Sequence, residues 1–241
     1  MSQVAFTQTL ERLTAKGEHV QFWLRDDDAV VPTVALKRLL DLCADHSVPL
    51  TLAVIPRDTE QPLATALQAR DNVAVAVHGW SHANHAGTSG KKQELGSHRP
   101  LAETVKELKA GFDKLSGLYP QQFIPMLVPP WNRIAPEVIE ALPALGFRSL
   151  SVFGPEKDAV PPLLNSHLDI MNWHGVRGGR DPEELFAELA KLLDEQGRPK
   201  TIGILTHHLV HDDNAWAFLQ ALMAATSGNP ACRWVGARDA V

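Results

Sequence analysis

Two clusters of histidine and one run of aspartate are the residues of this sequence best suited to chemistry. Six of the eleven histidines lie in two short segments, which hold His78, His82 and His85, and then His207, His208 and His211. Imidazoles grouped in this way suit a metal site or a proton-transfer site. The placement of the histidines therefore indicates function more strongly than their number does.

The aspartate run, Asp26 to Asp28, directly follows the apolar segment FWLR. Three adjacent carboxylates repel one another, and a bound cation or water would relieve that repulsion. The alternative is a solvated turn or a helix cap, because aspartate is common in turns. The position directly after a predicted strand favours a functional role.

His78 and His82 are four residues apart, a spacing that would place both rings on one side of a helical turn. The pair alone is weak evidence for a metal site. Together with a carboxylate from another strand end, it makes two histidines and one aspartate with an open coordination position, which is typical of catalytic zinc. The same donors also suit iron or another divalent ion.

Apolar runs alternate with amphipathic helical patterns along most of the chain. The predicted strands are 20–25, 50–55, 73–77, 123–128, 148–153 and 201–206, and the clearest helices are 34–46, 101–115, 136–146 and 181–197. This alternation predicts an α/β fold, a single-domain irregular (β/α) barrel of about seven units over residues 1–241. An open doubly wound sheet is the second possibility, although no glycine-rich nucleotide-binding motif follows the first strand.

The barrel prediction brings the polar clusters together, because active sites of such barrels lie at the carboxyl ends of the strands. The aspartate run, HGWSH, PPWNR and HHLVHDD each follow a predicted strand. The long polar loop at 85–100 is expected to form a lid or a wall of the substrate site. We assign His85 and His208 supporting or surface roles, and His211 to Asp213 a loop and helix cap.

Composition narrows the class of partner. The net charge is −5 and the basic residues are scattered, which argues against nucleic acid as a partner. The first twenty residues lack a secretory signal pattern and no segment has the apolar length of a membrane span, so we expect a cytoplasmic protein with no membrane association. Cys43 and Cys232 are expected to be free thiols.

The order of these motifs resembles the polysaccharide deacetylase family of zinc-dependent carbohydrate esterases, which remove acetyl groups from N-acetylated sugars. LRDDDA is similar to the family's aspartate motif, HGWSH to H-[ST]-x-x-H, and VPPW to R-x-P-[WY]. Residues 169–173 resemble D-x-x-D-W, and Leu205-Thr206-His207 resembles L-x-H. The similarity spans roughly residues 20–210 and implies the family's barrel.

The resemblance also implies roles for individual residues. The metal, zinc or another divalent ion, would be held by Asp27, His78 and His82. Asp26 would be the general base, His207 the general acid, and Asp169 would orient His207. Trp173 and Leu205 would form the pocket for the acetyl methyl group, and the backbone N–H of Trp131 would face the oxyanion.

Three positions depart from the family pattern. Val128 stands where the family has the arginine that orients the base, Asn172 replaces an aspartate, and Gly79 replaces Ser or Thr. Arg25 or Arg133 could supply the missing cation. A register in which Asp28 rather than Asp27 binds the metal is also open.

The sequence therefore predicts a metal-dependent hydrolase that removes an N-acetyl group from a sugar or a sugar-containing substrate. Such a metal polarises the amide carbonyl, a carboxylate takes a proton from the attacking water, and an imidazole protonates the departing amine. One alternative is an allantoinase-like amide hydrolase acting on a small substrate. Another is a non-catalytic sugar-binding barrel.

Overall fold

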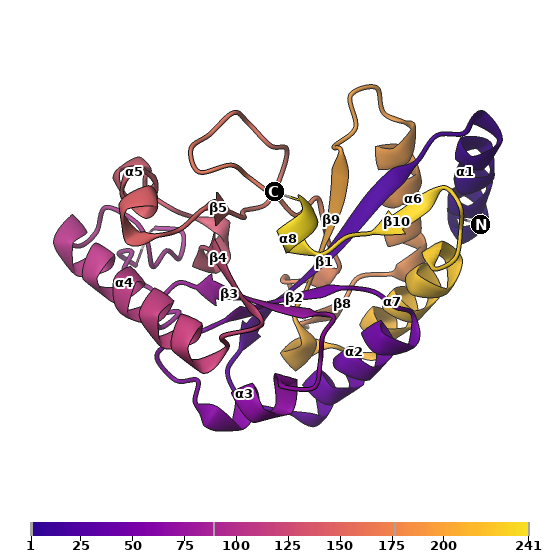
Figure 1. Cartoon of the computed structure of the whole chain (residues 1–241). Helices are drawn as coiled ribbons and strands as arrows, with labels where there is room; N and C mark the ends of the chain where they lie inside the picture. The colour runs from indigo at the N-terminus through magenta and orange to yellow at the C-terminus, as the bar shows by residue number, and fades with distance from the viewer. Residues whose placement is uncertain (1, 89, 176, 241) are drawn as a thin grey trace.

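The chain folds as a parallel sheet that curves into a bowl, with helices packed on its outer side (Figure 1). The computed structural model describes residues 2–88, 90–175 and 177–240. The longer strands are β1 (Val20–Ala29), β2 (Leu50–Val54), β3 (Val73–His78), β4 (Phe123–Val128) and β9 (Thr201–Thr206). The shorter strands are β5 (Ser149–Leu150), β6 (Leu168–Asp169), β7 (Met171–Asn172), β8 (Gly178–Gly179) and β10 (Cys232–Trp234).

The helices alternate with these strands. They are α1 (Ser2–Lys16), α2 (Val34–Asp45), α3 (Gln61–Leu67), α4 (Leu101–Leu118), α5 (Pro136–Leu145), α6 (Pro182–Asp194), α7 (Asp213–Thr226) and α8 (Ala237–Ala240), with 3₁₀ turns η1 (Pro130–Asn132) and η2 (His208–Val210). Thr33, Asp181 and Asp212 cap the N-termini of α2, α6 and α7 with their side chains. The helix cap predicted within His211 to Asp213 is therefore confirmed at Asp212.

The strand order is β5-β4-β3-β2-β1-β9-β6, and every neighbouring pair in this path is parallel. An irregular segment joins the two ends of the path. Leu150 forms an isolated bridge with Leu163, Phe153 forms another with Ser166, and the chain then continues directly into β6. The predicted irregular β/α barrel is confirmed, and its seam is made of bridges in place of a full strand.

Burial on both faces explains why the predicted strands could be recognised. Every residue of β2, β3 and β9 is buried, because helices cover the outside and side chains from opposite strands fill the inside. Cys43 and Cys232 are free thiols, as predicted. In the described part of the chain, no helix combines the length and apolar character that crossing a membrane requires.

Candidate metal and catalytic site

The carboxyl ends of the strands surround a cavity of about 690 Å³. Its volume lies within the roughly 300–1,000 Å³ typical of small-molecule sites. The cavity is lined by Asp27, Asp28, His78, His82, Asn84, Lys92, Trp131, Asn132, Arg133, Asp169, Trp173, His174, Arg177 and His207. The four polar segments that follow β1, β3, β4 and β9 therefore converge as the sequence predicted.

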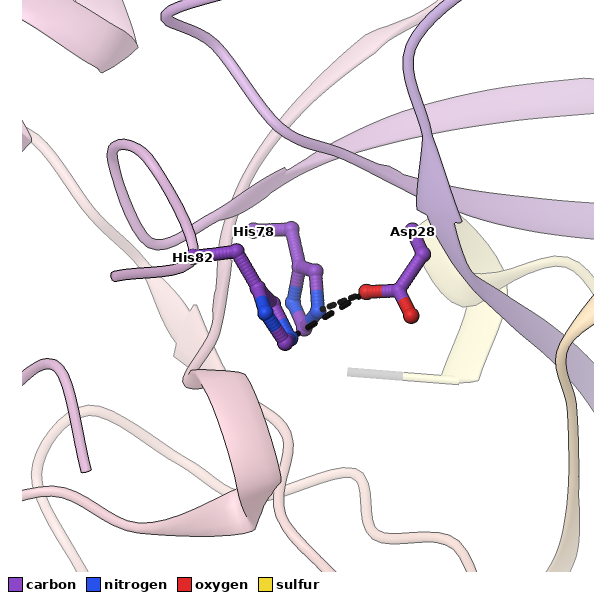
Figure 2. Close-up of side chains that lie close together, drawn as sticks. All are labelled: Asp28, His78 and His82. Atoms are coloured by element: carbon purple, nitrogen blue, oxygen red, sulfur yellow. Dashed lines mark hydrogen bonds and ion pairs between the residues drawn. The ribbon is translucent and has the colours of Figure 1, made fainter. Parts of the chain in front are cut away.

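Asp28, His78 and His82 form the cluster in this cavity that is suited to a metal ion (Figure 2). Asp28 Oδ1 lies 3.1 Å from His78 Nε2 and 3.2 Å from His82 Nε2, and the three ligand atoms lie within 4.8 Å of one another. Asp27, the carboxylate expected here, lies outside this cluster. The structure thus corrects the choice of aspartate by one residue and selects the alternative register.

A local change of backbone conformation explains this correction. Asp28 has φ of 72°, and the pairing of β1 with β2 shifts register between Asp26 and Ala29. In a regular strand alternate residues share a face, so Asp26 and Asp28 would point the same way. The left-handed residue at the strand end breaks that alternation, and both Asp27 and Asp28 line the cavity while Asp26 does not.

His78 and His82 are positioned by different contacts, and no helical turn connects them. His78 ends β3, and its Nδ1 donates to the Val128 carbonyl oxygen at 2.9 Å, which leaves Nε2 free to bind a metal. Gly79 and His82 both have positive φ, at 58° and 57°. The expectation of a helical turn from His78 to His82 is therefore wrong, because two left-handed residues bring the rings together.

A buried carboxylate holds this tight turn in place. Glu94 is only 1% exposed and accepts hydrogen bonds from the backbone N–H and the hydroxyl of Ser81 and from the N–H of Trp80. A Cβ on Gly79 would lie 2.0 Å from Glu94 Oε2, so a larger residue does not fit there. This accounts for glycine at a position where the family has Ser or Thr.

The donor set fits a divalent metal. Two imidazole nitrogens and one carboxylate oxygen converge, and the hydrogen bond to Val128 orients one ligand as protein metal sites require. The Trp131 ring packs on His82 with centroids 4.3 Å apart and restricts its motion. Burial alone would lower the pKa of His78, but the charges of Asp27 and Asp28 raise it overall, whereas burial and His78 lower the pKa of His82.

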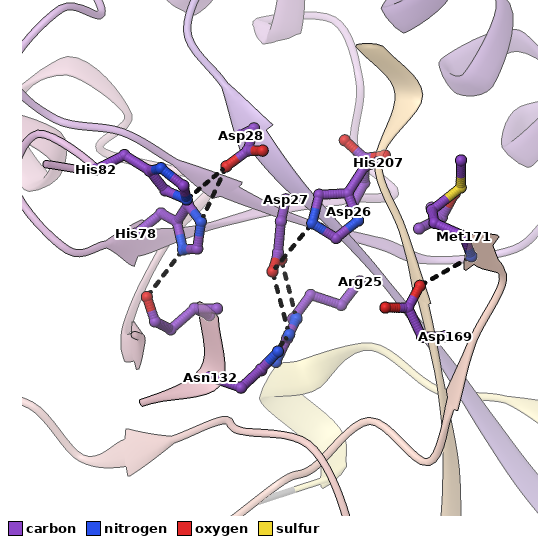
Figure 3. Close-up of polar contacts among 12 residues, drawn as sticks. Arg25, Asp26, Asp27, Asp28, His78, His82, Asn132, Asp169, Met171 and His207 are labelled. Atoms are coloured by element: carbon purple, nitrogen blue, oxygen red, sulfur yellow. Dashed lines mark hydrogen bonds and ion pairs between the residues drawn. The ribbon is translucent and has the colours of Figure 1, made fainter. Parts of the chain in front are cut away.

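Asp27 is paired with a buried arginine (Figure 3). Arg25 Nε lies 2.9 Å from Asp27 Oδ1, and Arg25 Nη2 donates to Asp27 Oδ2 at 3.1 Å. The same guanidinium donates to Asn132 Oδ1 at 2.8 Å and to Ser151 Oγ at 2.7 Å. Arg25 is therefore the cation that pairs with Asp27 in place of an arginine at position 128. Arg133, the other candidate, instead donates a hydrogen bond to the Lys92 carbonyl oxygen.

His207 lies on the other side of Asp27. Its Nε2 is 4.0 Å from Asp27 Oδ2, and the indole of Trp173 packs edge-on against its ring at 4.6 Å. Asp169 accepts hydrogen bonds from the N–H of Met171 and from Trp173 Nε1, and no hydrogen bond from His207 is formed. Asp169 and His207 are thus not in direct contact. Trp173 lies between them, since it donates to Asp169 and packs on the His207 ring, and the two groups also interact through their charges. Burial raises the pKa of Asp169.

Asp26 does not occupy the position expected of a general base. It is fully buried, and its carboxylate accepts from the backbone N–H of His208 at 2.7 Å and pairs with His208 Nδ1 at 2.5 Å. Burial opposes a charge on His208, but Asp26 raises its pKa overall. Asp26 and His208 together attach the end of β1 to the turn that carries His207.

The remaining predicted residues differ in whether they line the cavity. Trp131 and Trp173 line the cavity, whereas Leu205 is 1% exposed within the sheet and does not line it. In the sheet Leu205 pairs with Arg25 and Asp169, so it lies next to residues of the site, and its role in the acetyl pocket stays a prediction. The sequence did not reveal the role of Glu94, because an acidic residue inside a polar loop has no distinctive pattern. It also left open whether Arg25 or Arg133 supplies the missing cation.

Comparison with solved structures identifies the fold. The chain is similar to a family 4 carbohydrate esterase from Streptococcus mutans, with a TM-score of 0.61, 16% identity, and coverage of 96% of this chain and 90% of that one. It is also similar to the peptidoglycan deacetylase PdaC from Bacillus subtilis, with a TM-score of 0.59, 14% identity and coverage of 92% and 89%.

A third similar structure is a family 4 acetyl xylan esterase from Clostridium thermocellum in complex with a cobalt ion, with a TM-score of 0.56, 15% identity and coverage of 91% and 89%. No family model and no curated protein matches the sequence. The fold that the resemblance to polysaccharide deacetylases implied is confirmed.

Proposed function

We propose that this protein is a metal-dependent hydrolase that removes the acetyl group from an N-acetylated sugar. The observation that carries the proposal is one cavity that contains a metal-binding cluster, a carboxylate paired with a buried arginine, and an imidazole 4.0 Å from that carboxylate. Solved proteins of the same fold that are named as carbohydrate esterases or deacetylases support it.

Asp28, His78 and His82 would hold a divalent metal, which supplies Lewis-acid polarisation of the amide carbonyl and lowers the pKa of water. Asp27 takes the role of general base, and Arg25 fixes its orientation. The proposed base is thus Asp27 and not Asp26, and the proposed carboxylate ligand is Asp28 and not Asp27. Zinc suits two imidazoles and one carboxylate, and other divalent ions fit the same donors.

The proposed reaction uses two proton transfers. Water attacks the acetamide carbon while Asp27 accepts one of its protons, and the C–N bond then breaks as His207 donates a proton to the amine. The products are acetate and a free amino sugar, and return of the proton from Asp27 to His207 restores the site. Trp173 packs edge-on against the imidazole, and the backbone N–H of Trp131 would face the developing oxyanion.

Acetate release from N-acetylglucosamine and its oligomers tests this function. Protein loaded with zinc or cobalt should release acetate, and Asp27→Asn and His207→Gln should each lower kcat by about 10²–10⁴-fold, the contribution of a general base or acid. His98→Gln replaces an exposed histidine outside the cavity and serves as the matched control.

The outcome distinguishes the competing functions. Full activity in the Asp27 and His207 variants would refute the assigned roles. Activity that survives complete removal of metal, or activity on a cyclic amide in place of the sugars, would favour the allantoinase-like hydrolase. Saturable sugar binding without any acetate release would favour a binding protein.

A further inference from the structure

Three cationic side chains line the cavity without an acidic partner in the part of the chain that the structure describes. Lys92, Arg133 and Arg177 line the same cavity as the metal-binding cluster, and none forms an ion pair among the described residues. Most other arginines do form such pairs, including Arg12, Arg57, Arg70, Arg99, Arg180 and Arg198. Three basic side chains without a carboxylate partner in the described ranges therefore face one cavity, the one in which a substrate would bind.

The described carboxylates that face the cavity are held by other partners and form no ion pair with these three cations. Asp27 is paired with Arg25, Asp28 contacts the two imidazoles, and Asp169 accepts two N–H donors. They also lie on the strand ends, whereas the cations come from loops. A bound divalent metal would add further positive charge.

The three cations come from three segments that the fold brings together. Lys92 belongs to the long loop after β3, Arg133 follows η1, and Arg177 precedes β8. Arg133 Nη1 donates to the Lys92 carbonyl oxygen at 2.8 Å, which fixes those two segments side by side and leaves the Lys92 ammonium free. A protein with a net charge of −5 thus places three basic side chains around one cavity.

We infer that the substrate carries an anionic oxygen group, a carboxylate or a phosphate, in addition to the acetamide. This inference rests on the proposed deacetylase function and narrows its substrate class. Lys92, Arg133 and Arg177 bind the anion in the cavity while the acetamide reaches the metal-binding cluster. Guanidinium and ammonium groups recognise both anions, and Arg can do so with two parallel hydrogen bonds.

The test compares three substrates that share one N-acetylated sugar ring. They are N-acetylglucosamine, its 6-phosphate, and N-acetylmuramic acid, which carries a carboxylate. We expect kcat/KM for at least one anionic sugar to exceed that for the neutral sugar by about tenfold, with KM responsible for most of the difference and with the preference weakened by added salt. The phosphate and carboxylate arms show which anion fits.

The matched variants are Lys92→Gln with Arg177→Gln, and Lys91→Gln as control, since Lys91 is adjacent to Lys92 and lies outside the cavity lining. The double variant should lower the anionic-to-neutral ratio of kcat/KM by about tenfold, because each exposed ion pair contributes up to several-fold. The control should leave the ratio unchanged.

The two proposals fail in different ways. Equal turnover of neutral and anionic sugars would overturn the anion site and leave the deacetylase function intact. Absence of any turnover would overturn the function, and calorimetry with the 6-phosphate and N-acetylmuramic acid then tests the anion site alone. Binding that the double variant weakens supports the site, and binding that it leaves unchanged, or no binding, overturns it.

Discussion

Replacing Arg25 by methionine tests the most deeply buried interaction of the site. Arg25 is 0% exposed and its guanidinium contacts Asp27, Asn132 and Ser151. Methionine fills much of the space of the side chain but offers no donors, so Asp27 becomes a buried carboxylate without a counter-charge. We expect a loss of about 3–5 kcal/mol in the free energy of unfolding, the cost of removing one partner of a buried ion pair.

A second substitution separates the charge from the packing. In the double variant Arg25→Met with Asp27→Asn, no unpaired charge remains, so the loss should fall to about 1–2 kcal/mol, which reflects the hydrogen bonds to Asn132 and Ser151. Both variants should lose catalysis by about 10²-fold or more, since the base is misoriented in one and absent in the other. Stability and activity would thus respond differently to the same pair of changes.

Urea unfolding monitored by tryptophan fluorescence measures the stabilities, and acetate release measures the activity. Arg148→Met is the matched control, because Arg148 is exposed and should change stability by no more than about 0.5 kcal/mol. If Arg25→Met loses less than about 1 kcal/mol, or if the double variant is less stable than the single one, the reasoning from the buried pair is wrong.

Three further outcomes follow from the structure. Zinc or cobalt should bind at about one ion per chain, and Asp28→Asn or His78→Ala should abolish tight binding measured by calorimetry, whereas Asp181→Asn, at a helix cap outside the cavity, should not. Gly79→Ala should destabilise the fold by about 2–4 kcal/mol and weaken metal binding, because a left-handed conformation costs about 1–2 kcal/mol and Glu94 must move; wild-type stability in thermal unfolding would contradict this. Burial lowers the pKa of His211 from 6.5 to about 4, so the unfolded chain binds a proton first as pH falls. Stability should therefore decrease between about pH 6.5 and 4, by roughly 2–3 kcal/mol from this group, and His211→Gln should show a correspondingly smaller decrease; parallel pH profiles for the two proteins would rule out this contribution.

The sequence predicted the secondary structure correctly where a pattern of residues is typical of a single element. Apolar runs such as 73–77 and 201–206 predicted strands because both faces are buried, and the polar residues after them were placed at the site by the rule for barrel strands. By contrast α7 is apolar on most of its surface, so no polar face revealed its helical period. The two-residue strands β6, β7 and β8 are too short for any periodicity.

The site residues were less predictable, because backbone torsions decide which side chains meet. Nothing in the letters DDD shows that Asp28 has positive φ, and the spacing of His78 and His82 suits a helical turn that does not form. Leu205 was assigned to a pocket from its place in a motif, and in β9 it pairs with Arg25 and Asp169 but is only 1% exposed. The partner of Asp27 was nearby in sequence, but only the fold shows that Arg25 turns back toward it.

The left-handed residue at the end of β1 also has a consequence for engineering. Asp26, Asp27 and Asp28 are identical as letters, yet one joins two segments of the core, one is held by an arginine and one faces two imidazoles. Strand alternation separates Asp26 from Asp27, and the positive φ of Asp28 brings the third carboxylate to the cavity as well, so the three positions are not equivalent. A designer who grafts this motif onto another barrel must copy that angle as well as the three residues, or the carboxylates will arrive on the wrong faces of the strand.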